Sequence, residues 1–298
     1  MWRYYKYTSD GRMKKLRFGM SSCGFQDLSE ENFEGLQKSG VEELEISLRF
    51  NKYENFNYKM TQKRAEKFGI NLWSFHLPFQ PFETNNISSM DEDVRNNSIH
   101  LQSEYIKKAG DIGIGIFVIH PSAEPNREED RQILLENASN SLIKLADVAE
   151  SAGGIIAVEN LPRTCLGRDA YDISKLISAD ERLRVCYDTN HLLSQSAKKF
   201  IENVGKKIVT THFSDYDFKD ERHWLPGEGK VNWTEIIDSL LEVGYTGPIL
   251  YELGLLPPQS GTIHLRELTF DDFKENHNSL VNKKPLKVIG APVWEKCL

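Results

Sequence analysis

Short apolar segments recur eight times along the chain, and a helical pattern follows each of them. These predicted strands cover residues 16–21, 43–48, 71–76, 114–120, 155–159, 184–188, 208–212 and 248–252. Strands that alternate with helices pair in parallel. Eight such units in 298 residues predict an α/β protein with a (β/α)8 TIM barrel. The alternative, an open doubly wound sheet, is disfavoured because no GxGxxG turn follows the first segment.

The predicted barrel spans residues 16–280 as a single domain. Residues 1–15 are interpreted as an N-terminal extension, and residues 281–298 as an irregular C-terminal tail. The first twenty residues lack the apolar core of a signal peptide, and no segment is apolar for long enough to cross a membrane. We therefore expect no membrane partner.

Composition narrows the expected location and partners. The chain has four cysteines and no CxxC pair, which predicts free thiols in a reducing cytoplasm. The net charge of -7 provides no overall basic field, so nucleic acid is not an expected partner. A homo-oligomer is compatible with this composition.

Ionisable side chains end six of the eight predicted strands. These residues are His76, His120, Glu159, Asp188, His212 and Glu252, and the loops add His191, Arg222 and His223. Because the C-terminal ends of barrel strands meet at one mouth, the side chains are expected to converge there. Carboxylate oxygens mixed with imidazole nitrogens suit Zn²⁺, Mn²⁺ or Fe²⁺, and not Ca²⁺. Buried ionisable groups are costly unless they are paired or bind a metal, so the set predicts a metal site.

Several motifs resemble those of the xylose-isomerase-like TIM-barrel superfamily. They are V-E-N at 158–160, D-T-N-H at 188–191, H-F-S-D at 212–215, R-H-x-x-P-G-E-G at 222–229 and Y-E-L at 251–253. The superfamily holds sugar and sugar-phosphate isomerases and epimerases, inosose dehydratases, and abasic-site nucleases of the endonuclease IV type. The resemblance covers residues 16–280.

The keto-sugar epimerase branch of this superfamily implies one divalent ion. Its ligands would be Glu159, Asp188, His212 and Glu252, with Mn²⁺ or Zn²⁺ preferred and Mg²⁺, Fe²⁺ or Co²⁺ as alternatives. The resemblance also makes Glu159 and Glu252 the catalytic acid and base. A ketose carbonyl and its neighbouring hydroxyl on the ion would acidify the C–H between them, and the reaction would pass through an enediolate. The implied enzyme is a cytoplasmic isomerase or epimerase of carbohydrate metabolism, acting on a small sugar, sugar phosphate or polyol.

Other residues are expected to bind the substrate. His191, Arg222 and His223 would orient it, while His76 and His120 would line the pocket; structural hydrogen bonding is the alternative for each histidine. Trp73, Phe75 and Phe79 are expected to supply an apolar wall. The remaining histidines, His100, His264 and His277, are predicted to lie on the surface.

Two other functions remain open. The endonuclease IV branch of the superfamily implies three zinc ions. One would be held by His76, His120 and Glu159, and another by the four ligands named above. The remaining ion would be held by His191 together with an Asp-x-His pair. This chain reads Glu221-Arg222-His223 at that pair, and the departure argues against the third ion. The second alternative is a barrel that binds a sugar without turnover, which the two retained glutamates disfavour. We therefore favour the one-metal enzyme.

Overall fold

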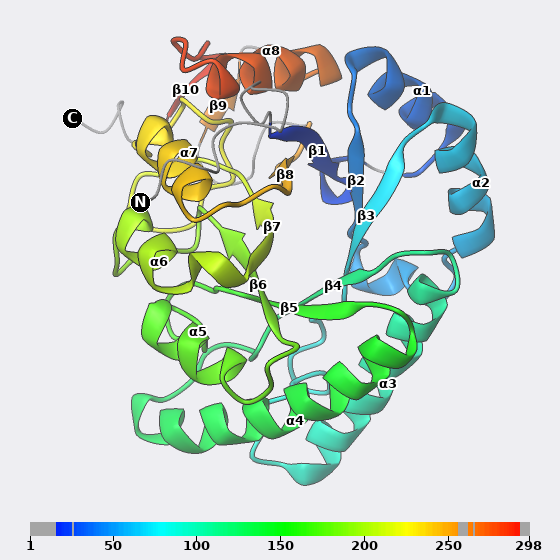
Figure 1. The fold of residues 1–298 in the computed structure, drawn as a ribbon, viewed down its shortest axis with the longest axis vertical. Helices are drawn as coiled ribbons and strands as arrows, with labels where there is room; N and C mark the ends of the chain where they lie inside the picture. The colour runs from blue at the N-terminus through cyan, green and yellow to red at the C-terminus, as the bar shows by residue number, and fades with distance from the viewer. Residues whose placement is uncertain (1–15, 26, 256–261, 265, 293–298) are drawn as a thin grey trace.

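Eight parallel strands form a barrel surrounded by helices in the computed structural model, which describes residues 16–25, 27–255, 262–264 and 266–292 (Figure 1). The barrel strands are β1 (Arg17–Ser21), β2 (Glu43–Ile46), β3 (Asn71–His76), β4 (Ile116–Ile119), β5 (Ile155–Glu159), β6 (Arg184–Asp188), β7 (Ile208–His212) and β8 (Pro248–Tyr251). Their order in the sheet is β7-β6-β5-β4-β3-β2-β1-β8. A parallel bridge between Phe213 and Tyr251 brings the two edge strands together. The predicted TIM barrel is therefore confirmed.

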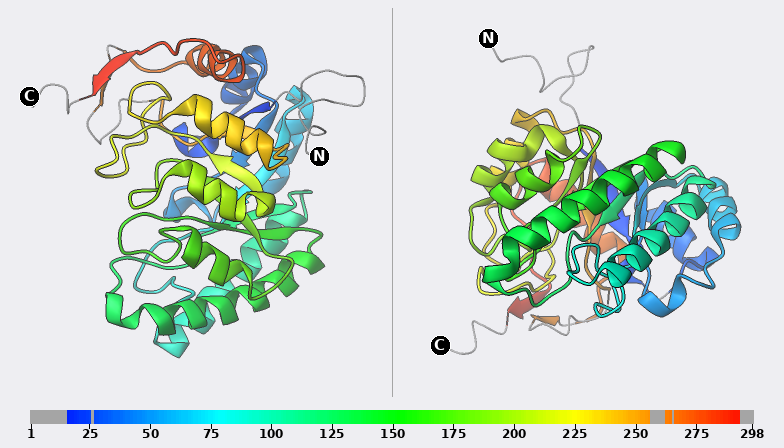
Figure 2. Two further views of the ribbon diagram at one scale, coloured as in Figure 1. Left: turned by 60° about the vertical axis from the view of Figure 1, so that its left-hand side comes forward. Right: turned by 90° about the horizontal axis from the view of Figure 1, so that it is seen from below.

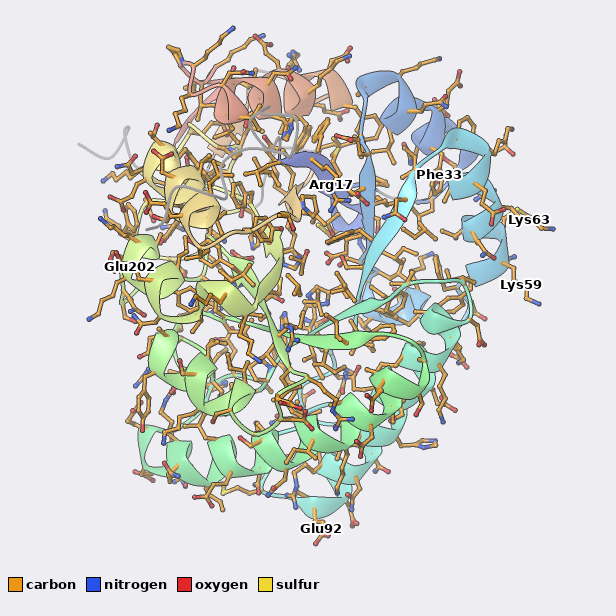
Figure 3. All side chains as sticks on the ribbon, in the orientation of Figure 1. Arg17, Phe33, Lys59, Lys63, Glu92 and Glu202 are labelled. Carbon is orange, nitrogen blue, oxygen red and sulfur yellow. The ribbon has the colours of Figure 1, made fainter. Side chains whose placement is uncertain are left out.

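The helices form the outer layer (Figure 2). They are α1 (Glu30–Ser39), α2 (Tyr58–Phe68), α3 (Glu92–Gly110), α4 (Arg131–Ser151), α5 (Ala170–Ile177), α6 (Ala197–Val204), α7 (Trp233–Glu242) and α8 (Phe270–Val281). In Figure 3, Phe33 of α1 points toward the sheet, whereas Lys59 and Lys63 of α2 point into solvent. Among the described residues, no helix combines the length and apolarity that crossing a membrane requires.

Local sequence signals set the helix ends. The side chain of Ser29 accepts a hydrogen bond from the Asn32 amide at the start of α1, and Thr269 and Asp272 form a capping box at the start of α8. Gly40 and Gly69 end α1 and α2 with φ angles of 79° and 66°, a left-handed conformation that glycine adopts without a steric penalty. These caps set where the three helices begin or end.

Alternation along each strand separates two apolar layers. On β5, Ile156 and Val158 pack against the helices, whereas Ala157 belongs to a small cluster inside the barrel. Glu159 lies two residues after Ala157, so its side chain projects on the inner side at the mouth. Cys186 and Asp188 repeat this arrangement on β6. The period of two therefore places acidic side chains directly above the barrel interior.

Two register shifts adjust this alternation. Between β6 and β7 the pairing moves from Val185–Ile208 to Cys186–Thr210, and His212 consequently pairs with Asp188. A similar shift between β2 and β3 brings a glutamate opposite a serine inside the barrel. An extra residue of this kind reorients the side chains that follow it.

Two sequence-based expectations about the C-terminal part were wrong. The tail was expected to be irregular, yet β10 (Gly290–Pro292) pairs antiparallel with β9 (Thr262–His264). Three-residue strands are too short to show a period. His277 was expected on the surface but is buried, with its ring stacked on Phe18 at 4.8 Å. The side chain of His264 and the N-terminal extension lie outside what the structure describes.

Candidate metal centre

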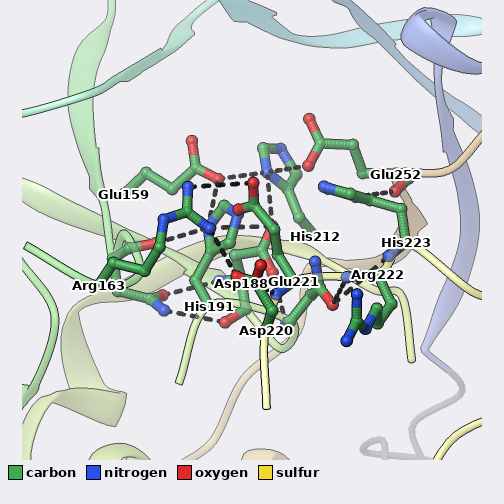
Figure 4. A network of polar contacts seen from close by, with 12 residues as sticks. Glu159, Arg163, Asp188, His191, His212, Asp220, Glu221, Arg222, His223 and Glu252 are labelled. Carbon is green, nitrogen blue, oxygen red and sulfur yellow. Dashed lines mark hydrogen bonds and ion pairs between the residues drawn. The ribbon is translucent and has the colours of Figure 1, made fainter. Parts of the chain in front are cut away.

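Four side chains from neighbouring strands meet at the mouth of the barrel. Glu159, Asp188 and His212 are the last residues of β5, β6 and β7, and Glu252 follows β8. One ligand-type atom of each lies within 4.8 Å of those of the other three (Figure 4). His212 Nδ1 lies 3.0 Å from Glu159 Oε1, 3.2 Å from Glu252 Oε2 and 3.8 Å from Asp188 Oδ2. We call these four residues the quartet.

The carboxylate of Asp188 has an unusual environment. Asp188 Oδ1 accepts a hydrogen bond from the Asn190 amide at 2.6 Å, but the buried Asp188 Oδ2 has no hydrogen-bond partner among the described residues. Burial raises the pKa of Asp188 well above its ordinary value. A buried carboxylate oxygen without a donor is costly unless a cation is near. The quartet therefore fits a divalent ion.

A second group shares Glu159 with the quartet. Glu159 Oε2 lies 3.2 Å from His76 Nε2 and 3.1 Å from His120 Nε2. Glu159 Oε1 faces His212, so each oxygen of this carboxylate serves a different group. Phe79 stacks on the His120 ring at a centroid distance of 4.3 Å. The residue types and spacing of His76, His120 and Glu159 suit a metal ion as well.

A third group lies at the other side of the quartet. It contains His191, Glu221 and His223, and His191 Nε2 lies 3.3 Å from Glu221 Oε2. By sequence, Glu221 is a departure from Asp-x-His, in which an aspartate stands two residues before the histidine. In the structure the Glu221 side chain nevertheless lies with His191 and His223, in the group that a third ion would need.

Hydrogen bonds fix the ring nitrogens of three of these histidines. The Nδ1–H groups of His76, His191 and His223 donate to the backbone carbonyls of Leu77, Asn160 and Glu252, at 2.9, 2.9 and 3.2 Å. Because Nδ1 is the donor, Nε2 of each ring is the nitrogen available to a metal. Such fixed tautomers are typical of metal-binding histidines.

Arg163 connects three loops around the third group. Its guanidinium contacts Glu124 and Asp220 and lies 3.2 Å from Glu221 Oε1. Its φ angle of 51° is uncommon for a residue with a side chain. No sequence pattern identifies Arg163, because its partners lie on loops that are distant in the chain.

Arg222 pairs with an acidic residue of the chain, and two of the three predicted wall residues lie away from the site. The guanidinium of Arg222 pairs with Asp217 Oδ2 at 3.1 Å, so its predicted contact with substrate stays a prediction. Of the aromatic residues, Phe79 lies at the site, but Phe75 faces the helices and packs against Tyr53. Trp73 lies under the Arg17 guanidinium, at the opposite end of the barrel. The period of two and the register shift beside Trp73 explain these two errors.

The His191–Glu221 pair predicts a pH window for the stability of the metal-free protein. Burial opposes charge on both groups, but Asp188 and the hydrogen bond to Glu221 raise the pKa of His191 from 6.5 to about 10. Burial is likewise outweighed at Glu221, where the hydrogen bond from His191 lowers the pKa from 4.5 to about 2. The stability that ionised Glu221 contributes is complete above pH 4.5 and is lost as the pH falls through about 2. The stability that protonated His191 contributes is complete below pH 6.5 and is lost as the pH rises through about 10.

Glu221→Gln is therefore expected to lower the free energy of unfolding of the metal-free protein most between pH 4.5 and 6.5. Urea unfolding of both proteins across the pH range measures the difference. A difference that does not vary with pH would contradict the ion pair.

Comparison with known proteins identifies the family. Residues 25–267 match the family described as xylose isomerase-like TIM barrel. The chain belongs to this family. An uncharacterised protein of Methanocaldococcus jannaschii is 26% identical over 80% of this chain and 83% of its own length. The D-psicose 3-epimerase of Ruminiclostridium cellulolyticum is 24% identical over 74% of this chain and 76% of that enzyme.

Further relatives of the family differ in their described activities. A probable endonuclease 4 of Finegoldia magna is 29% identical over 52% of this chain and 60% of its own length. The crystal structure of a D-tagatose 3-epimerase-like protein shares the fold, with a TM-score of 0.71 and 22% identity over 80% of this chain and 91% of that one. The relatives thus include a sugar 3-epimerase and a probable endonuclease.

Proposed function

We propose that this chain is a metal-dependent sugar epimerase or isomerase that moves a proton next to a carbonyl. The observation that carries the proposal is that Glu159 and Glu252 approach the same nitrogen, His212 Nδ1, at 3.0 and 3.2 Å. They come from β5 and β8, so they flank the other two members of the quartet. Two carboxylates around one metal position suit removal of a proton by one and its return by the other. The epimerases among the relatives support the same proposal.

The quartet would hold one divalent ion, with Mn²⁺ or Zn²⁺ preferred. When bound, such an ion polarises the carbonyl oxygen of a sugar and acidifies the adjacent C–H. The proposed substrate is a small sugar, a sugar phosphate or an oxidised polyol, because the proton that moves must lie next to a carbonyl.

Glu252 is suited to accept the proton. In the metal-free protein burial opposes its ionisation, but the positive charge of His212 and its hydrogen bond lower the pKa of Glu252 to about 2; a bound divalent ion would take the place of that positive charge. The carboxylate is consequently ionised at neutral pH. Its side chain is 12% exposed, compared with 1% for Glu159, so a substrate entering the mouth meets Glu252 first. Glu159 would complete the transfer from the other side.

The histidines and Arg222 would position the substrate. His191 and His223 border the quartet and are proposed to orient substrate hydroxyls together with Arg222. His76 and His120 hold the second oxygen of Glu159 at 3.2 and 3.1 Å, which would restrict the rotation of that carboxylate.

Solvent exchange tests the proposal. The metal-loaded protein is incubated in D₂O with D-psicose, D-tagatose, other ketoses and their phosphates, and the substrate is expected to incorporate one deuterium beside its carbonyl. Proton NMR measures this exchange and the appearance of the epimer. Absence of exchange with every ketose would contradict the proposal.

A second candidate function is a zinc phosphodiesterase acting on abasic DNA. Two observations favour it: Glu159 belongs to two groups of possible ligands, and a third group lies beside them. The three groups together contain ligands for three ions. Three adjacent ions can stabilise both the attacking and the leaving oxygen of a phosphodiester. The endonuclease relative adds support.

Glu221→Gln separates the two candidates. Glu221 belongs to the third group and lies outside the quartet. If the chain is an epimerase, the substitution should change ketose exchange only a few-fold. If the chain is a nuclease, zinc-loaded wild-type protein should incise a duplex with an abasic site, and the variant should lose this activity.

A further inference from the structure

A buried glutamate of β2 contacts the ring nitrogen of His212 that does not face the other members of the quartet. Glu45 has no exposed surface, and both of its carboxylate oxygens lie 3.1 Å from His212 Nε2. The opposite nitrogen of the same ring, Nδ1, faces the other members of the quartet. Glu45 is not one of the four residues whose ligand-type atoms lie within 4.8 Å of one another.

The strand register places Glu45 inside the barrel, opposite a hydrogen-bond donor. Leu44 and Ile46 pack in the outer core, so the residue between them points into the barrel. The register shift between β2 and β3 sets Glu45 opposite Ser74 instead of Trp73. Ser74 Oγ then donates to Glu45 Oε2 at 2.8 Å. The serine fixes the carboxylate, and the carboxylate accepts the Nε2–H of His212.

We propose that Glu45 is a positioning residue for the metal ligand His212, which it holds with Nε2 protonated and Nδ1 directed at the metal. This inference rests on the proposed metal-dependent function of the quartet. A carboxylate that accepts the outer N–H of a ligating histidine fixes the tautomer and makes the ligating nitrogen more basic. His76, His191 and His223 donate their outer N–H groups to backbone carbonyls. Among these three and His212, only His212 has a carboxylate as the acceptor.

The same strand supplies a matched control. Glu43 lies two residues before Glu45, is also buried, and pairs with Arg17 and Asn71 instead of a quartet member. Glu45→Gln and Glu43→Gln therefore remove one buried carboxylate each from the same strand, and only the first removes a contact with His212.

Metal affinity is the first measurement. Competition with a chelator is expected to show a dissociation constant for zinc about 10- to 100-fold higher in Glu45→Gln than in wild type. Glu43→Gln should remain within about twofold of wild type, as expected for a residue outside the metal's surroundings. Equal affinities in the two variants would overturn the inference.

Nitrogen-15 NMR of histidine-labelled wild-type protein keeps the test independent of variant folding. His212 Nε2 is expected to carry a slowly exchanging proton in both the metal-free and the zinc-loaded protein, and zinc should shift the Nδ1 resonance. Zinc binding at Nε2, or a rapidly exchanging Nε2 proton in the metal-free protein, would overturn the inference. A wild type that binds no metal would overturn the proposed function separately, because the NMR result for the metal-free protein still decides the role of Glu45.

Discussion

Glu159→Gln and Glu252→Gln are each expected to lower the rate of proton exchange on a ketose by about 10²- to 10⁴-fold. Glutamine has nearly the same shape as glutamate but cannot accept a proton from carbon. Both residues are also proposed ligands, so metal affinity should fall in both variants. Exchange is measured by NMR in D₂O at saturating metal, which separates the loss of the base from the loss of the ion.

Two controls accompany these variants. Glu43→Gln removes a buried carboxylate far from the mouth and should leave the exchange rate unchanged, because Glu43 contacts Arg17 and Asn71. Circular dichroism should show the same helix content in all three variants. If both Glu159→Gln and Glu252→Gln retain wild-type exchange with metal bound, the two-carboxylate mechanism is wrong.

Asp188→Asn is expected to change stability in opposite directions with and without metal. In the metal-free protein at neutral pH, the substitution replaces a buried carboxylate oxygen that has no donor among the described residues. We expect it to raise the free energy of unfolding by about 1–3 kcal/mol. Burial raises the pKa of Asp188, so the gain should shrink as the pH falls through this raised pKa and should be gone at the ordinary value of 3.8.

With metal bound, we expect wild type to be more stable than Asp188→Asn. At a free metal concentration of about 1,000 times the dissociation constant, wild type should gain about 4 kcal/mol, whereas Asp188→Asn should gain much less because it lacks one ligand. Chemical unfolding with and without metal measures all four values. If metal stabilises both proteins equally, Asp188 is not a ligand.

The sequence allowed much of the quartet to be predicted, because strand and ligand share one local pattern. An apolar run that ends in a carboxylate or imidazole identifies both a buried strand and its mouth end, as at Glu159 and His212. The period of two then fixes the inward direction. Pairing of His212 with Asp188 depends on a register shift that the pattern does not reveal.

Residues that act through distant partners were harder to predict. The alternation around Glu45 is compatible with a side chain that points into a cavity and equally with a solvated or salt-bridged one, and only the barrel brings Glu45 to His212. Arg163 and Glu221 lie on separate loops, whose mutual position depends on the packing of several strands. His277 was misjudged because a helix pattern does not identify a histidine stacked on Phe18.

Metal content per chain tests the central claim most directly. The protein is purified without chelator or added metal, and elemental analysis is combined with a protein concentration from amino-acid analysis. The proposed epimerase predicts about one equivalent of manganese, zinc or a related divalent ion, lost in a Glu159→Gln, Asp188→Asn double variant. About three equivalents of zinc would contradict the one-metal account in favour of the phosphodiesterase, and a site that takes up no metal would contradict both.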